Sequence, residues 1–187
     1  MAYLSEFELK KIGFKLLGKN VLVSNKASIY EAYKIEVGDN SRIDDFCLLS
    51  GKITIGKNVL ITPYCNLAGG EKGIVLEDFT TLAYGVHVFS QSDDYSGKTM
   101  TNSTVPKKYK EEIKEQIIIK KHSIIGTGSN IMPGVIIGEG TSVGAMSLVT
   151  KSTKEWSLYY GIPARMIKEK SRDLLKLEVK YLEERQK

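Results

Sequence analysis

The stretch that decides the fold runs from Gly126 to Lys151 and reads GTGSNIMPGVIIGEGTSVGAMSLVTK. Aliphatic residues recur in it every six positions, at Ile131, Ile137, Val143 and Val149. A helix has a period of 3.6 residues and a strand a period of 2, so neither element alone produces a period of six. A short strand followed by a turn does, and such hexads are typical of a parallel β-helix. Three hexads would complete one triangular coil of eighteen residues.

Outward from this stretch, the spacing of eighteen recurs along most of the chain. The aliphatic pairs eighteen positions apart are Val37 and Ile55, Ile43 and Ile61, Leu49 and Leu67, Ile119 and Ile137, Ile125 and Val143, and Ile131 and Val149. One hexad has no hydrophobic face that it can cover alone, so the aliphatic stripe becomes buried only when coils stack. The sequence therefore predicts an all-β fold, a parallel β-helix of hexapeptide repeats.

Two segments interrupt the repeat. GGEK, at 69–72, adds a short bulge, and about 90–114 inserts SQSDDYSGKTMTNSTVPKKYKEEIK. This long insertion is polar and carries no repeat of its own. Long excursions from a rigid scaffold are functional or disordered as a rule. We expect a functional arm that leaves the coil at a corner.

The chain is long enough for one domain with a substantial core, so we predict a single domain over 1–187. Within it we expect an N-terminal helical cap at 1–20 and the β-helix at 21–160. A closing loop and a C-terminal helix are expected at 161–187.

Both ends carry helix signals. The segment LSEFELKKIGF predicts a short helix with Ser5 as N-cap and with Leu4, Phe7 and Ile12 as apolar anchors. The C-terminal segment 172–187 predicts a second helix, which would cap the open end of the coil or contact a neighbouring subunit. Its apolar residues, mostly on one side, are Leu174, Leu175, Leu177, Val179, Tyr181 and Leu182.

Composition limits the possible partners. The net charge is +5 with a pI near 9.0, but the basic residues form no dense arm and no aromatic platform accompanies them. This argues against nucleic acid and suits a phosphorylated ligand. No run of about 18 apolar residues exists, and the first residues lack the apolar core of a signal peptide. We expect a cytoplasmic protein without membrane insertion.

Cys47 and Cys65 are eighteen positions apart, each at the fifth place of its hexad. They should stack on successive coils near the strand spacing of roughly 4.7–4.9 Å. A disulfide is geometrically conceivable, but two buried thiols fit a cytosolic protein better.

With these features the chain resembles the hexapeptide-repeat acyltransferases, whose fold is a left-handed β-helix. The resemblance covers roughly 35–168 and is most specific in IIGTGSNIMPGVIIGEGTSVGAMSLVTKS and in YYGIPARMIK. The galactoside, maltose and xenobiotic acetyltransferases are similar, as are sugar acetyltransferases of bacterial surface-polysaccharide pathways. The resemblance implies a left-handed coil, a homotrimer, and acetyl-CoA as co-substrate in a groove between subunits.

It also implies cofactor residues. Thr127 and Ala145 would offer backbone groups to the pantetheine arm, although simple turn sterics explain the same two residues. Thr150 and the GIPAR loop would border the adenosine end, with Arg165 and Lys168 near the phosphates. Arginine binds phosphate through bidentate hydrogen bonds and lysine as a point charge.

The catalytic base is where the sequence departs from the family. Members that acetylate hydroxyls place a histidine after the strand that leads into the arm, because imidazole accepts a proton near neutral pH. Here Asp93, Asp94 or Tyr95 stands at that place. His87, six residues before Asp93, is an outward-facing candidate for catalysis or substrate binding. His122 occupies a turn position, and we expect it to be an exposed structural residue.

The missing histidine favours an amine acceptor, since a neutral amine attacks a thioester without prior deprotonation. FSQSDD also resembles the FTND stretch of acetyltransferases that act on nucleotide-linked amino sugars. We therefore predict N-acetylation of a nucleotide-linked amino sugar for O-antigen or capsule synthesis, with Asp93 and Asp94 orienting the amine or accepting its proton. Three alternatives stay open: a galactoside-type O-acetyltransferase with an aspartate or His87 as base, a non-catalytic scaffold, and a mere Asx turn in SDDYSG.

Acceptor contacts are expected on the preceding coil. By the same resemblance Asn66 and Glu71 lie where relatives contact the sugar, although a solvated bulge explains Glu71 equally well. No metal is expected. The γ-type carbonic anhydrase, a zinc enzyme on this scaffold, needs three histidines, and the chain has two.

Overall fold

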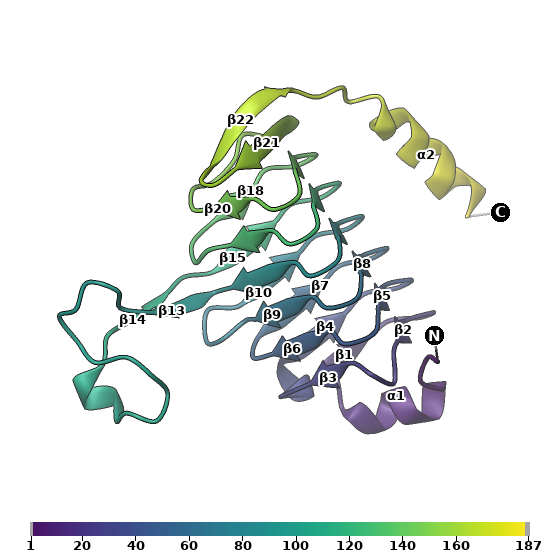
Figure 1. The fold of residues 1–187 in the computed structure, drawn as a ribbon. Coiled ribbons are helices and arrows are strands. Elements are labelled where there is room, and N and C mark those ends of the chain that lie inside the picture. The colour runs from purple at the N-terminus through teal and green to yellow at the C-terminus, as the bar shows by residue number, and fades with distance from the viewer. Residues whose placement is uncertain (1, 186–187) are drawn as a thin grey trace.

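The computed structural model describes residues 2–185 and shows a chain wound into a parallel β-helix (Figure 1). Each coil contributes one short strand to each of three parallel sheets. The first sheet contains β1 (Leu16–Leu17), β4 (Ile35–Val37), β7 (Ile53–Ile55), β10 (Ile74–Leu76), β15 (Ile117–Ile119) and β18 (Ile136–Ile137). The second contains β2 (Leu22–Val23), β5 (Arg42–Ile43), β8 (Leu60–Ile61), β11 (Thr81–Leu82), β16 (Ile124–Ile125), β19 (Ser142–Val143), β21 (Ser157–Gly161) and β22 (Ala164–Glu169). The third contains β3 (Ser28–Ile29), β6 (Leu48–Ser50), β9 (Asn66–Ala68), β12 (His87–Phe89), β17 (Asn130–Ile131) and β20 (Leu148–Val149).

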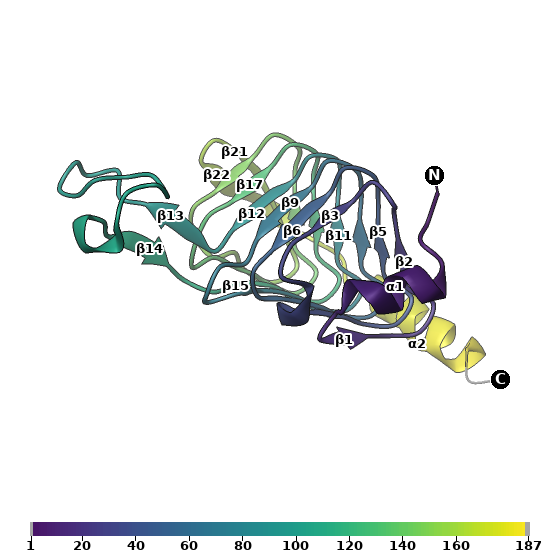
Figure 2. The same ribbon diagram turned by 90° about the horizontal axis from the view of Figure 1, so that it is seen from below.

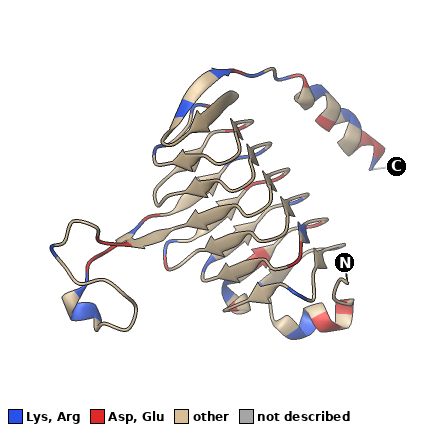
Figure 3. Ribbon diagram, in the orientation of Figure 1, with Lys and Arg blue, Asp and Glu red and all other residues tan. Residues whose placement is uncertain are grey.

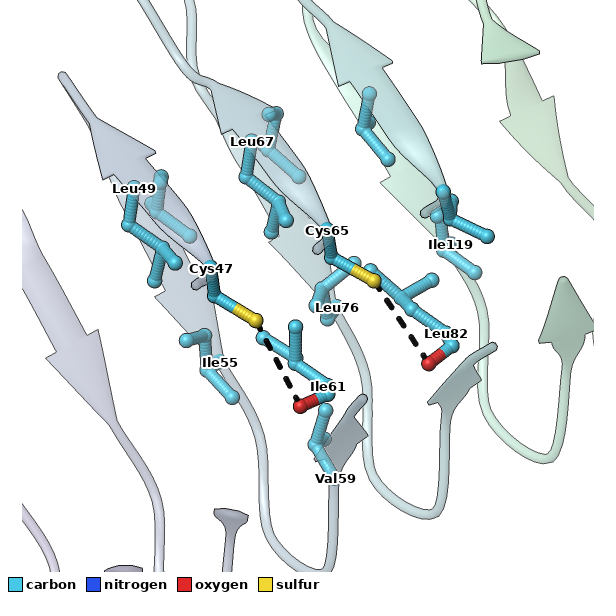
Figure 4. Packing of buried hydrophobic residues seen from close by; sticks show 14 of the residues in the cluster. Cys47, Leu49, Ile55, Val59, Ile61, Cys65, Leu67, Leu76, Leu82 and Ile119 are labelled. Atoms are coloured by element: carbon cyan, nitrogen blue, oxygen red, sulfur yellow. Dashed lines mark hydrogen bonds between the residues drawn. The ribbon is translucent and has the colours of Figure 1, made fainter. Parts of the chain in front are cut away.

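The strand register confirms the predicted stacking. Val37 pairs with Ile55, Ile43 with Ile61, and Leu49 with Leu67, and the three later pairs also match. The stacked aliphatic side chains fill the inside of the coil and are almost completely buried (Figure 4). Removing a Val, Leu or Ile side chain from water is worth about 1.5–3 kcal/mol. This column of stacked aliphatic side chains is therefore the main source of the stability of the fold.

Cys47 and Cys65 lie within this column as free, buried thiols, as predicted. Their sulfur atoms contact main-chain carbonyls of the next coil, at 3.1 Å from Thr62 O and 3.2 Å from Ala83 O. Contact with Cys65 and burial together raise the pKa of the Cys47 thiol. Cys47 is therefore a packing residue and no nucleophile.

The coil turns at three corners, which we name by the sheets that they join. The first corner joins the first sheet to the second, the second corner joins the second to the third, and the third corner leads into the next coil. The first corner holds one residue with positive φ on each coil, for example Asn58 (φ 55°), and the second corner holds one on each coil from Phe46 to Met146, for example Tyr64 (φ 66°). These left-handed positions fall in two vertical rows along the outside of the coil.

Helix α1 (Glu6–Ile12) covers the N-terminal coil (Figure 2). Ser5 is its N-cap and forms a complete capping box with Glu8, as the sequence predicts. Leu9 is buried in the core, and Leu4 and Ile12 pack against it. Phe7 is 67% exposed, so its predicted role as an anchor is wrong. It projects from the opposite face of the helix, because residues two positions apart point in different directions.

The predicted boundaries need two corrections. Strand β1 already pairs with β4, so the coil begins inside the segment 1–20 that we expected to be only a cap. At the other end, β22 pairs with β21 in an antiparallel hairpin over the last coil. Residues 164–169 of the expected closing loop are therefore a strand, and this hairpin closes the open end.

Helix α2 (Leu174–Glu184) is shorter than predicted, and residues 186–187 of the predicted helix lie outside the described residues. It does not cap the open end. It runs down the first corner (Figure 1), where the Tyr181 hydroxyl donates to Asn58 and Arg185 donates to Asn40.

His122 is held under this helix. Its side chain is only 7% exposed, and its Nε2 lies 2.9 Å from Glu178 of α2. The ring stacks on Phe79 with centroids 5.2 Å apart. His122 is structural, as predicted, but the expectation that it is exposed is wrong, because α2 covers the corner.

Candidate active site

The inserted arm leaves the coil at the third corner, directly after β12 (Figure 1). Its stem is an antiparallel pair of strands, β13 (Gln91–Asp93) and β14 (Glu112–Lys114), and beyond it lies a short 3-10 turn at Lys107–Tyr109. The stem places the start of the arm at a defined position beside the third sheet.

Charged side chains fix the base of this stem. Lys114 contacts Glu71 of the preceding coil at 3.0 Å and Glu112 at 3.2 Å, and Lys110 contacts Glu112 at 2.9 Å. Lys110 and Lys114 together lower the pKa of Glu112. Figure 3 shows charge of both signs on the arm, the corners and the terminal helices, whereas the coil strands are mostly uncharged.

A pocket of about 380 Å³ lies at the root of the arm. Its lining residues are Phe89, Gln91, Ser92, Asp93, Tyr95, Ser103, Glu112 and Met132. Asp93 is partly buried there, and its Oδ2 accepts a hydrogen bond of 3.3 Å from the backbone N–H of Asn102. Asp93 lies opposite Glu112 across the stem, so the pocket carries two carboxylates.

Asp94 has a different environment. Its Oδ1 accepts from the backbone N–H of Ser96 at 2.8 Å, and its Oδ2 accepts from the hydroxyls of Ser96 and Thr99. The backbone and side-chain hydrogen bonds from Ser96 lower the pKa of Asp94. This is an Asx turn, one of the alternatives that the sequence left open. Asp94 shapes the arm, and its carboxylate is ionised at neutral pH.

His87 and Asn66 lie side by side on the outer face of the third sheet, in register on adjacent strands. The His87 ring stacks on Phe89, with centroids 5.8 Å apart, and Phe89 also lines the arm-root pocket. Asn66 Oδ1 and His87 Nδ1 are buried, and neither has a hydrogen-bond partner among the described residues. Unpaired buried polar atoms are rare and costly. A ligand or a neighbouring subunit would satisfy these two.

Glu71 lies apart from this pair. It is an exposed residue of the bulge at the third corner, and its ion pair with Lys114 lowers its pKa. The structure thus brings Asn66 together with His87, and it places Glu71 at the foot of the arm.

Thr127 and Ala145 are stacked on successive coils at the second corner, and both are exposed. The Thr127 carbonyl accepts from Met146 N at 2.7 Å. Within residues 2–185, the backbone N–H groups of Thr127 and Ala145 donate to no other group of the chain. Pro63, which has no N–H, occupies the same corner position on a lower coil. The corner therefore leaves these two amides free to bind a ligand.

The other predicted cofactor residues are spread more widely. The GIPAR turn reaches the second corner, where Gly161 N donates to the Ser147 hydroxyl, and Arg165 lies next to it on β22. Lys168 lies further along β22 and lines a groove of about 630 Å³ with Lys170 and Ser142. Thr150 follows β20 and lies at the third corner. Thr127, Ala145 and Arg165 thus share one corner, whereas Thr150 and Lys168 do not.

Sequence reasoning missed several residues of the arm-root pocket, among them Phe89, Glu112 and Met132. They come from three separate segments, and only the arm stem brings them together. Over residues 2–185, no group of three or more His, Cys, Asp or Glu side chains is placed to hold a metal ion. In the same range, no helix has the length and apolar character needed to cross a membrane.

Comparisons with known proteins agree with this architecture. Residues 116–151 match the family model described as bacterial transferase hexapeptide (six repeats). The chain is 41% identical to a dTDP-4-amino-4,6-dideoxy-D-glucose acyltransferase of Escherichia coli, over 95% of this chain and 94% of that protein. It is 30% identical to the putative colanic acid biosynthesis acetyltransferase WcaF of Escherichia coli K12, over 88% of this chain and 74% of that one.

Among solved structures, the chain is similar to AntD, an N-acyltransferase from Bacillus cereus, in complex with dTDP and 3-hydroxybutyryl-CoA. The identity is 47%, the TM-score is 0.97, and the match covers 99% of this chain and 98% of AntD. A single-residue variant of AntD, bound to dTDP-4-amino-4,6-dideoxyglucose and coenzyme A, matches at 48% identity with the same TM-score of 0.97. The predicted fold class, a left-handed parallel β-helix of hexapeptide repeats, is confirmed.

Proposed function

Because this chain belongs to the bacterial hexapeptide-repeat transferases, we propose that it transfers an acyl group from a coenzyme A thioester to the amine of a dTDP-linked amino sugar. Acetyl-CoA is the proposed donor, and a 4-amino-4,6-dideoxy sugar is the proposed acceptor. Relatives of 41% and 47% identity that match over nearly the whole chain act on, or bind, such molecules. The product would serve the synthesis of a surface polysaccharide.

The observation that carries an amine acceptor is the arm-root pocket, which is lined by Asp93 and Tyr95. These are two of the three residues, with Asp94, that the resemblance aligns with the histidine of hydroxyl-acetylating members. A neutral amine attacks the thioester carbonyl carbon without prior deprotonation. The carbon–sulfur bond then breaks, and the sulfur leaves as a thiolate. The proton lost from the new ammonium group passes to a nearby carboxylate and from there to solvent. Asp93 suits this role because it is partly buried and, among residues 2–185, its carboxylate accepts one hydrogen bond, from a backbone N–H.

The other residues of the proposed site bind and orient. Asn66 and His87 each present a buried polar atom that has no hydrogen-bond partner within residues 2–185, and the acceptor would satisfy both atoms. The free amides of Thr127 and Ala145 would hydrogen-bond the pantetheine arm, and Arg165 at the same corner would bind a phosphate. Thr150, Lys168 and Glu71 would act at the edges of the site, and Asp94 would hold the arm in shape.

We infer that the active unit is a homotrimer. The second corner is convex and exposed, so Thr127 and Ala145 on one chain cannot enclose a pantetheine arm by themselves. A neighbouring coil would form the second wall of the groove. A cytoplasmic location fits the two free thiols, which lie on adjacent coils and stay reduced in such a compartment.

The test is acyl transfer from acetyl-CoA to matched acceptors, followed by mass spectrometry. We expect dTDP-4-amino-4,6-dideoxyglucose to be acylated faster than the 4-hydroxyl analogue by about 10²–10⁴-fold, the usual contribution of a general base that the hydroxyl would need. The rate should rise with pH as the sugar amine deprotonates. A faster hydroxyl acceptor, combined with loss of activity in His87→Ala, would identify an O-acyltransferase with His87 as base. Failure to acylate any acceptor, with no binding of acetyl-CoA, would favour a non-catalytic scaffold.

A further inference from the structure

Two rows of aromatic side chains run along the outside of the coil, at left-handed corner positions. The row at the first corner contains Phe79, His122 and Trp156. His122 stacks on Phe79 at 5.2 Å and lies 6.4 Å from Trp156. Tyr181 of α2 meets Phe79 edge-on at 6.0 Å. This row is therefore covered by the protein's own C-terminal helix.

The row at the second corner contains Phe46 and Tyr64, whose rings stack with centroids 5.2 Å apart and an interplanar angle of 16°. These side chains are 50% and 60% exposed, and no helix covers them among residues 2–185. Two large aromatic rings therefore stack on each other and remain exposed to solvent.

The backbone makes this arrangement costly. Phe46 has φ 59° and Tyr64 has φ 66°, a region that is unfavourable for bulky side chains. At the same corner position, the next two coils carry Gly85 and Gly128. Left-handed residues recur at this corner as part of the coil, so the unusual feature is the pair of large exposed rings and not the φ angle itself. Such a pair of rings offers a contact surface to a flat ligand.

The geometry of the row leaves one ring face open. Lys26 covers Phe46, with its Nζ 5.4 Å from the ring centroid. Tyr64 is followed one coil higher by Gly85, where an added Cβ would meet no atom within 4 Å. Higher still, Met146 folds over Gly128, because a Cβ on Gly128 would lie 2.6 Å from the Met146 sulfur. Open space therefore lies outside Gly85, between the level of Tyr64 and that of Met146, and we call this space the slot.

The slot has the height of one flat ring. Successive coils are about 4.7–4.9 Å apart, so a ring at the level of Gly85 would continue the stack of Phe46 and Tyr64. Its upper face would meet the Met146 sulfur at a distance typical of sulfur–aromatic contacts, about 5 Å. A ring in the slot would therefore extend the aromatic row by one coil.

We propose that Phe46 and Tyr64 are the stacking platform for the pyrimidine base of the acceptor nucleotide, with the base on the open face of Tyr64 above Gly85. This rests on the proposed function, which supplies a pyrimidine nucleotide. The free amides of Thr127 and Ala145 lie higher on the same corner, so donor and acceptor would bind along one line. The adenosine end of the donor would lie at the far end of that line, with its phosphates near Arg165.

Phe46 and Tyr64 offer the base a surface for stacking, and the platform carries little free positive charge for the phosphates. Lys26, the cation in the row, is 3.4 Å from the Asp45 carboxylate and is paired with it. Base–aromatic stacking tolerates salt, whereas phosphate contacts weaken as salt rises. The contribution of these rings to nucleotide affinity should therefore be independent of ionic strength.

The experiment is calorimetric titration of the full chain with dTDP at low and high salt. Tyr64→Ala should weaken dTDP binding by about 5- to 150-fold, the range of one base–aromatic stack. Phe46→Ala should weaken it less, because Phe46 supports the Tyr64 ring from below and does not contact the base. Tyr64→Phe should retain the wild-type affinity. Phe7→Ala is the matched control, because Phe7 is an exposed ring under a lysine, Lys11, at 4.1 Å, but lies on α1.

A second variant fills the slot. Gly85→Phe places a ring at a left-handed position that Phe46 and Tyr64 already adopt on the coils below, so the coil should fold. We expect it to abolish dTDP binding while coenzyme A still binds. A normal thermal transition would show that the coil is intact.

Four outcomes would overturn the proposal. The first is unchanged dTDP affinity in both alanine variants, and the second is loss of coenzyme A affinity in place of dTDP affinity. The third is a loss of dTDP affinity whose size depends on salt concentration. The fourth is dissociation of the oligomer with dTDP affinity retained. The third would mean that the residues act through phosphate contacts, and the fourth that a neighbouring subunit covers the rings. If the wild type acylates the amino sugar but the variants bind dTDP normally, the proposed stacking platform is wrong and the proposed function is supported. If the wild type binds no dTDP, the proposed function itself fails.

Discussion

At the scale of single residues, the role of the backbone amides at the second corner can be tested by removing one N–H. Pro63 shows that this corner position accepts proline, so Thr127→Pro should fold while losing one N–H. A hydrogen bond contributes about 0.5–1.5 kcal/mol, and we therefore expect coenzyme A to bind about 2- to 10-fold more weakly. Calorimetry with a thermal melt measures both quantities.

Ala145→Trp is the complementary change, because it obstructs the corner without touching the amide. It should block acyl-CoA binding and leave the thermal transition in place, since Ala145 is exposed. Thr127→Ser keeps the amide and serves as the control. Wild-type coenzyme A affinity in both Thr127→Pro and Ala145→Trp would show that the donor binds elsewhere.

The two neighbouring aspartates should respond differently to the same substitution. Asp93 lines the arm-root pocket, so Asp93→Asn should lower kcat by about 100-fold, the lower end of general-base contributions. Asp94 accepts hydrogen bonds from Ser96 in an Asx turn, and asparagine keeps the oxygen that the backbone N–H requires. Asp94→Asn should therefore cost less than Asp94→Ala, which also loses the turn.

Steady-state kinetics on the amino sugar separates these roles. His87→Ala should raise KM more than it lowers kcat, because its buried Nδ1 is positioned for binding. An Asp93→Asn enzyme with wild-type kcat would exclude Asp93 as the proton acceptor. In that case Glu112 would be the remaining carboxylate that lines the arm-root pocket.

At the scale of elements, helix α2 is held to the first corner by Glu178. Burial alone would raise the pKa of Glu178, but hydrogen bonds from Lys121 and His122 outweigh it and keep the pKa below 4.5. A carboxylate with a lowered pKa stabilises the folded state at neutral pH, and this contribution is lost as the pH falls below 4.5. We expect α2 to detach in acid before the coil unfolds.

Hydrogen exchange of α2 measures this detachment. Glu178→Gln should increase exchange at neutral pH by the loss of about 1.5–3 kcal/mol, the value of hydrogen bonds to charged groups. Glu183→Gln is the matched control on the same helix, since Glu183 makes no ion pair within the described chain. Equal protection of α2 in both variants would show that apolar contacts of Leu174, Leu177 and Tyr181 hold the helix alone.

At the scale of the whole molecule, the second corner is exposed, and Asn66 Oδ1 and His87 Nδ1 have no hydrogen-bond partner within residues 2–185. A neighbouring subunit would cover the corner and pair with these atoms. We expect light scattering to give three chains of 20.8 kDa each at micromolar concentration. Mixing Asp93→Asn with Ala145→Trp chains would then test a shared site. Mixed trimers should recover part of the activity if one chain supplies Asp93 and its neighbour supplies Ala145. A monomer at that concentration would exclude the shared site.

The sequence by itself determined the coil. A period of six and a spacing of eighteen predicted the three sheets, the strand register and the buried column, including Cys47 and Cys65. This was possible because each coil contacts only its neighbours, so a local repeat specifies the stacking of the whole. The break in the repeat located the arm for the same reason, and the capping box at Ser5 is local as well.

Only the tertiary structure decided where the non-repeating segments lie. The hairpin β21–β22 closes the coil, α2 buries His122 at the first corner, and Phe7 turns to solvent. The arm stem brings Asp93 and Phe89 to one pocket, and Thr150 lies one corner away from Ala145. These positions depend on contacts between segments with no periodic relation to each other. Such contacts are set by shape and charge in three dimensions, and no spacing along the chain encodes them.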